Sequence, residues 1–99
     1  MSYAEHEVFL LPWHFCDEGE SSYYRLFLVE VSCEYRLYLR KGMWQLWTRY
    51  ATHTPWKLGI WHSLPEGKYH AYHHILTYKI YETGEWNPQR KDEIKLITL

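Results

Sequence analysis

Phe27-Leu28-Val29-Glu30-Val31-Ser32-Cys33-Glu34-Tyr35-Arg36-Leu37-Tyr38-Leu39 is the stretch of sequence on which the fold class depends. Every odd-numbered residue in it is apolar, and four of the six even-numbered residues are Glu, Ser or Arg. Alternation with a period of two is typical of a β-strand with one buried face. A single strand of this length would reach about 43 Å. Because a domain of this size has a radius of gyration of about 13 Å, we expect the strand to bend or to protrude.

Segments of strand-forming residues flank this stretch and are separated by turn-forming residues. Pro12 places the first segment at a sheet edge or at a bulge, because proline cannot donate a ladder hydrogen bond. Gly42 offers the positive φ that a hairpin turn needs. Residues 16–22 and 63–68 have the composition of turns. The strands predicted outside residues 27–39 are residues 8–15, 43–51, 56–61, 69–81 and 94–99.

Residues 43–51 also fit a helix, since their apolar residues fall on one helical face. We favour a strand because the segment is short, lacks a good N-cap and is rich in Trp, Thr and Tyr. The sequence therefore predicts a single domain over residues 1–99, with an all-β fold or a β-rich α+β fold that has one short helix. Its sheet would be antiparallel, with five to seven strands and long bent central strands.

The charged residues nearly cancel. The 99 residues include 11 Lys and Arg against 12 Asp and Glu, so the formal net charge is -1. A net charge so close to zero disfavours uniform binding to nucleic-acid phosphates. No apolar run approaches the roughly 20 residues that cross a bilayer, so we expect no membrane span. Cys16 and Cys33 fit free thiols better than a disulfide, because the predicted first hairpin does not place them opposite each other.

Candidate chemical groups are few. His70 and His74 could share a metal on a helix, but on the predicted strand they lie about 13 Å apart, too far for two ligands at about 2 Å from one zinc ion. Cys16 near His14 could form an activated thiol, yet nothing in the sequence places the imidazole beside the sulfur. The chain lacks hydrolase and phosphate-loop motifs. We therefore predict no catalytic residues, no metal and no cofactor.

Four tryptophans fall within eighteen residues and are the remaining candidates for function. They either fill a core that is short of aliphatic volume, or form an exposed face that stacks bases, grips sugars or docks a protein. Basic residues follow them closely in sequence and would give such a face a mildly basic rim. The candidate contact residues are Trp44, Trp47, Trp56, Trp61, Arg49 and Lys57.

Some stretches carry a resemblance. The proline-interrupted start Leu10-Leu11-Pro12-Trp13, the following Cys16-Asp17-Glu18-Gly19 and the stretch Tyr81-Glu82-Thr83-Gly84-Glu85-Trp86-Asn87-Pro88 flank a body rich in Tyr and Trp. In length and texture the chain resembles the small proteins of archaeal filamentous viruses. That resemblance implies a viral protein of hot, acidic springs, stable to heat and acid, in the cytoplasm of the host cell or in the virion. It brings no catalytic residues with it.

Three functional hypotheses remain open. We favour a non-enzymatic protein that acts through protein contact, as a homodimer or with a host protein, because the chain has long strands, many aromatic residues and no catalytic motif. The alternative is binding of single-stranded nucleic acid through an aromatic face, which the net charge disfavours. A small enzyme that uses His and Cys chemistry comes third.

Overall fold

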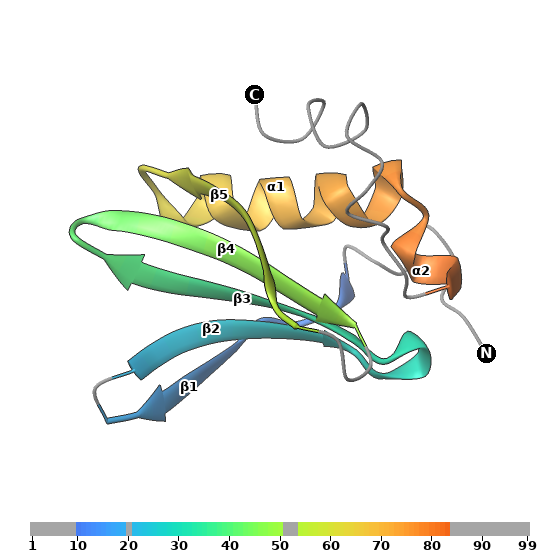
Figure 1. Cartoon of the computed structure of the whole chain (residues 1–99), viewed down its shortest axis with the longest axis horizontal. Coiled ribbons are helices and arrows are strands. Elements are labelled where there is room, and N and C mark those ends of the chain that lie inside the picture. Colours follow the sequence, from blue (N-terminus) through green and yellow to red (C-terminus); the bar gives the residue numbers. More distant parts are fainter. Residues whose placement is uncertain (1–9, 20, 51–53, 84–99) are drawn as a thin grey trace.

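A five-stranded antiparallel sheet with a helix against one face forms the core of the computed structural model, which describes residues 10–19, 21–50 and 54–83 (Figure 1). Neighbours in sequence are neighbours in the sheet, so the strand order is β1-β2-β3-β4-β5 and the sheet is open. The prediction of a β-rich antiparallel fold with five to seven strands is confirmed. The strands are β1 (His14–Glu18), β2 (Ser21–Leu28), β3 (Cys33–Arg40), β4 (Met43–Tyr50) and β5 (Trp56–Trp61).

The long strand predicted over residues 27–39 is wrong, because the chain reverses direction inside it. β2 ends at Leu28, the 3-10 turn η2 (Val29–Val31) follows, and Ser32 adopts a left-handed conformation with φ of 53°. Leu28 then lies opposite Cys33 in the ladder between β2 and β3. The excess length of the predicted strand is thus resolved by folding back, not by bending or protruding.

The apolar alternation continued through this reversal by coincidence. The inward residues of β2 have even numbers, such as Leu26 and Leu28, whereas those of β3 have odd numbers, such as Tyr35 and Leu37. The connection between the strands changes the parity. Val29, which fits the odd-numbered apolar series, is 63% exposed at the turn. The series therefore did not mark one buried face.

The strand predicted over residues 69–81 is also wrong. Helix α1 (Leu64–Thr77) and the short helix α2 (Ile80–Thr83) occupy this region. The predicted turn at residues 63–68 is instead the start of α1, where Ser63 is the N-cap and its hydroxyl accepts a 3.3 Å hydrogen bond from the amide of Glu66. Ser63 and Glu66 have the spacing of a capping box. The buried residues of α1 are Gly67, Ala71, His74 and Ile75, at helical spacing.

The hairpin at Gly42 and the next two strands are confirmed. Lys41 and Gly42 have φ of 52° and 77°, as the tight turn between β3 and β4 requires. β4 covers the segment for which helix and strand competed, apart from residue 51, which lies outside the described residues. β5 carries an irregularity in register opposite Leu46 and Trp47, next to Gly59, where the sequence indicated a bulge or a close backbone approach.

The first hairpin is shifted relative to its prediction. β1 begins at His14, and the turn is short, because Glu18 already lies opposite Ser21 and Gly19 has φ of 70°. Both cysteines are free thiols, as expected, with Cys16 beside Tyr23 in the ladder and Cys33 beside Leu28. The predicted strand over residues 94–99 lies outside the described residues. Of the predicted strand over residues 8–15, residues 8 and 9 also lie outside them, residues 10–13 precede β1, and only residues 14 and 15 belong to β1.

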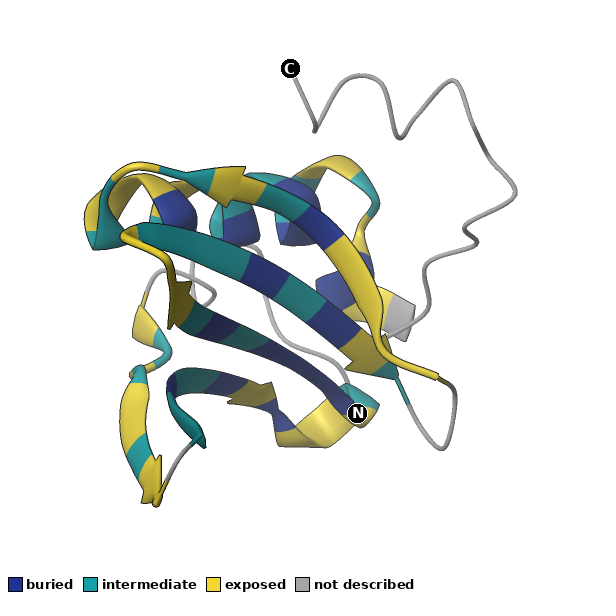
Figure 2. Cartoon of the chain, turned by 60° about the vertical axis from the view of Figure 1, so that its left-hand side comes forward, coloured by how far each residue is buried: buried dark blue, intermediate teal, exposed yellow. Residues whose placement is uncertain are grey.

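The core lies between the sheet and α1. Figure 2 shows buried residues recurring along the central strands and along α1. His74 is fully buried within this core, and its Nδ1 is 2.7 Å from the hydroxyl of Tyr35 on β3. No helix in the described part of the chain is both long and apolar enough to cross a membrane. Among the described residues, α1 covers one face of the sheet and no helix lies on the opposite face (Figure 1). The large fully buried residues are Tyr35, Leu26, Leu28, Leu37, Leu46, Ile75, Ile80 and His74.

Candidate functional site

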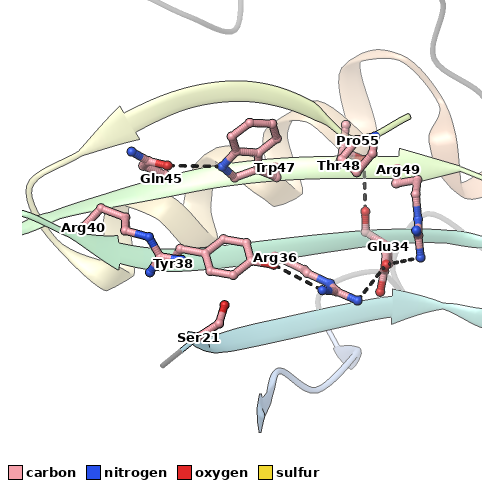
Figure 3. Close-up of a pocket in the computed structure, with 10 residues that line it drawn as sticks. All are labelled: Ser21, Glu34, Arg36, Tyr38, Arg40, Gln45, Trp47, Thr48, Arg49 and Pro55. Atoms are coloured by element: carbon pink, nitrogen blue, oxygen red, sulfur yellow. Dashed lines mark hydrogen bonds and ion pairs between the residues drawn. The ribbon is translucent and has the colours of Figure 1, made fainter. Parts of the chain in front are cut away.

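The open face is the side of the sheet opposite α1, formed by the outward residues of the five strands. On β3 and β4 these residues stand in register, with Glu34 opposite Arg49, Arg36 opposite Trp47, and Tyr38 opposite Gln45. Opposite residues of an antiparallel pair project to the same side, so the six side chains gather in one area. They line a pocket of about 390 Å³ (Figure 3). Its other lining residues are Ser21, Arg40, Thr48 and Pro55.

Glu34 lies at one end of this pocket and holds three arginines. Its side chain is nearly buried and forms ion pairs with Arg25 on β2, with Arg36 at 3.3 Å, and with Arg49 on β4 at 2.9 Å. Burial raises the pKa of Glu34, but the hydrogen bond from Arg25 and the positive charges of Arg36, Arg25 and Arg49 outweigh it, so its pKa lies below the ordinary value. The carboxylate is therefore ionised at neutral pH, and one negative charge orients three positive ones.

Aromatic rings support the guanidinium groups on the open face. The guanidinium carbon of Arg36 lies 4.4 Å from the ring centroid of Tyr23, and that of Arg40 lies 4.8 Å from the ring centroid of Tyr38. Arg36 also donates a 3.1 Å hydrogen bond to the Tyr38 hydroxyl. The rings of Tyr23 and Tyr38 are 5.1 Å apart. Stacking on rings limits the freedom of these long side chains, so the positive groups are preorganised.

Trp47 supplies the aromatic surface at the pocket wall. Its indole Nε1 donates a 3.3 Å hydrogen bond to the side-chain oxygen of Gln45, two residues earlier on the same face of β4 (Figure 3). The ring is half-buried. A planar ligand that lies against the ring would therefore be close to Gln45 and to Arg36, the cross-strand neighbour of Trp47.

The open face is positive although the whole chain is not. The outward strand positions hold five cations against two carboxylates, Glu34 and Glu18, which is a local excess of three positive charges. Glu18 accepts a 2.7 Å hydrogen bond from the Tyr23 hydroxyl, and this bond, with burial, raises the pKa of Tyr23 to about 12. The tyrosine thus stays neutral at physiological pH. The five cations are Arg25, Arg36, Arg40, Arg49 and Lys57.

The structure separates the tryptophans singled out from the sequence. Trp47 lines the pocket on the open face. Trp44 and Trp61 lie opposite each other in register and pack against the core on the α1 side, where the Trp61 ring stacks 4.3 Å from the His70 ring. Trp56 lies at the start of β5 and is 44% exposed.

The two basic candidates both belong to the open face. Arg49 lines the pocket, and Lys57 lies opposite Trp47 in the ladder between β4 and β5. Sequence reasoning did not select Glu34, Arg36 or Tyr38. Glu34 and Arg36 belonged to the polar set of even-numbered residues in the opening stretch, and Tyr38 is the next even-numbered residue; this series was used to predict a strand and not to predict a site.

His70 and His74 lie on α1, so the 13 Å separation expected on a strand does not apply. His70 stacks on Trp61, and His74 is buried against Tyr35. Burial lowers the pKa of His74 to about 3 and also lowers the pKa of His70. Among residues 10–19, 21–50 and 54–83 no group of three or more His, Cys, Asp or Glu side chains is arranged to hold a metal ion.

Burial of Cys33 raises its pKa to about 12, so this thiol is protonated and unreactive. Cys33 thus offers no reactive thiol, and the cations and rings of the open face are suited to binding an anion that carries a flat ring. No family model, curated protein or solved structure matches the chain.

Proposed function

We propose that the open face binds single-stranded nucleic acid. The observation that carries this proposal is the gathering of five cations on one side of the sheet, where Arg36, Arg40 and Arg49 line a pocket together with Trp47. Sites for single strands combine a positive groove with aromatic rings on which bases stack. The pocket volume of about 390 Å³ falls in the range of small-ligand pockets and suits one nucleotide unit.

The side chains divide into two roles in this proposal. Trp47 stacks a base, because its ring is the aromatic wall of the pocket. Arg40 and Lys57 are exposed and meet phosphates on either side of that base. Arg49 has donors beyond the one directed at Glu34 and reaches a third phosphate. Bases in a duplex are already stacked on each other, so a single strand is the form that fits.

The distribution of charge removes the objection raised by net charge. A chain with net charge -1 attracts no polyanion on average, but the local field of five cations acts over about 8 Å at physiological salt. Phosphates at the open face therefore meet mainly positive charge. We expect binding to weaken steeply as salt rises.

Fluorescence anisotropy with a labelled eight-nucleotide strand tests the proposal. The strand should bind, the duplex of the same length should bind more weakly, and log Kd should rise linearly with log salt concentration. A competition arm with a free nucleoside monophosphate distinguishes a strand site from a mononucleotide site. Equal competition by the monophosphate at the same concentration of nucleotide units would assign the site to the small molecule.

Two pairs of variants locate the binding surface. Trp47→Leu should weaken binding by about 5- to 150-fold, which corresponds to about 1–3 kcal/mol of stacking, whereas Trp56→Leu should leave it unchanged. Arg40→Gln should reduce the salt slope by about 0.7, and Lys68→Gln, which removes one charge from α1, should not. Equal effects within each pair would place binding elsewhere and contradict the proposal.

Contact between two copies of the chain is a second candidate, favoured by the edge strand β5. Trp56 and Ile60 on this strand are each 44% exposed, and large apolar side chains at a sheet edge promote association. Sedimentation over a range of concentrations tests this. A dimer that Ile60→Lys disrupts would support it, and a monomer at high concentration would contradict it.

A further inference from the structure

The amide of Gln45 has a fixed orientation in the pocket. An indole Nε1 is only a donor, so the atom of Gln45 that lies 3.3 Å from it must be the amide oxygen. The amide nitrogen is then turned away from the indole, as Figure 3 shows. Its two hydrogens remain for a group that rests against Trp47. The pocket thus presents a donor of known position beside its aromatic wall.

The other polar groups of the pocket are also mainly donors. The Glu34 carboxylate already accepts hydrogen bonds from Arg25 and Arg49 and pairs with Arg36. The Tyr38 hydroxyl accepts a bond from Arg36, which leaves the tyrosine proton to be donated, and the exposed Arg40 and Arg49 of the pocket carry further N–H groups. A ligand that enters between these groups therefore meets N–H and O–H groups far more than acceptors.

We infer that the pocket prefers bases that carry a carbonyl group where others carry an amine, so that uracil is preferred to cytosine and guanine to adenine. This inference rests on the proposed function. A base stacked on Trp47 would accept a hydrogen bond from the Gln45 amide nitrogen through its carbonyl oxygen. An amine at the same place would point donor at donor, and both groups would lose their water without replacement.

Uracil and cytosine make the cleanest comparison, because the two rings have the same size and differ only along one edge, where uracil carries a carbonyl oxygen and an N3–H group and cytosine carries an amine and an unprotonated N3. Anisotropy with eight-nucleotide strands of uridine and of cytidine gives the ratio of their Kd values. We expect the uridine strand to bind about tenfold more tightly. Gln45→Leu removes the donor and should bring the ratio close to one. Met43→Leu, a change on the same strand and face but outside this pocket, should keep the ratio.

The outcomes separate the two proposals. Tighter binding of uridine that disappears in Gln45→Leu supports the inference. Equal binding of the two strands, or tighter binding of cytidine, overturns the base preference while binding itself stands. A ratio that persists in Gln45→Leu also overturns the role of Gln45. Failure of both strands to bind the unmodified protein overturns the proposed function.

Discussion

Acid should destabilise this protein through His74, the fully buried histidine of α1. Burial, with a smaller effect from His73, lowers the pKa of His74 to about 3, against 6.5 for an unperturbed histidine. His74 is therefore neutral in the folded protein over a range in which the unfolded chain binds a proton. Its neutral form stabilises the fold fully above pH 6.5, and that stability is lost as pH falls towards 3.

The magnitude follows from the difference between the two pKa values. Between pH 6.5 and pH 3 the unfolded state binds up to one more proton, so the free energy of unfolding falls by about 1.4 kcal/mol per pH unit. The total loss from His74 is about 5 kcal/mol, comparable with the whole stability of a small domain. The viral resemblance implies stability to acid. The burial of His74 predicts the opposite effect, since it lowers the free energy of unfolding in acid.

Urea unfolding followed by circular dichroism at pH 7, 6, 5, 4 and 3.5 measures this effect. His74→Asn keeps an amide near the Tyr35 hydroxyl but cannot titrate, so the free energy of unfolding of this variant should depend less on pH. At pH 7 the variant should be less stable than the unmodified protein, because asparagine fills less of the buried site. His62→Asn, a change at an exposed histidine, serves as the control and should follow the unmodified protein. The carboxylates titrate in both proteins, so a difference between their curves of unfolding free energy against pH must come from His74. Parallel curves for His74→Asn and the unmodified protein would therefore refute the reasoning.

Three further predictions concern packing, capping and the thiols. Gly67→Ala should cost about 1–3 kcal/mol, because the added Cβ would lie 2.6 Å from a methyl carbon of the fully buried Leu37; unchanged urea midpoints would contradict this. Ser63→Ala should lower stability by about 1 kcal/mol through loss of the N-cap of α1, and a wild-type melting temperature would disprove it. A thiol reagent should modify only Cys16 in the native protein and also Cys33 in denaturant, since burial protects Cys33; native labelling of both would be inconsistent with the structure.

The sequence predicted the fold class because strand signals in this chain are local. Residues 43–50 and 56–61 carry β-branched and aromatic side chains, and Gly42 marks a turn that only a positive φ can make. Helix α1 was not predicted, because three of its buried positions are Gly67, Ala71 and His74, and these residues do not form a clear apolar pattern with helical spacing. The capping box that begins at Ser63 was the available signal for it.

The site was harder to predict because it depends on which strands become neighbours. Trp47, Arg49 and Lys57 were selected from their closeness in sequence, and all three lie on the open face. Arg25 and Arg36 joined them only because the chain reverses between β2 and β3 and so changes the parity of the inward residues. The strand predicted over residues 27–39 contained Arg36 but not Arg25, so nothing in the prediction brought the two together. The net charge did not reveal the five cations of the open face, because a sum over the whole chain says nothing about where the charges lie.

The arrangement of the arginines is itself an argument for binding. Arg25 and Arg36 stand directly opposite each other in the ladder between β2 and β3, where like charges destabilise a sheet. Glu34 compensates for part of this repulsion by pairing with both, but Arg49 shares the same carboxylate, so positive charge remains in excess. Stability alone does not require that excess. Features that oppose stability concentrate at functional sites, and an anion bound at the open face would relieve the repulsion that the folded chain retains.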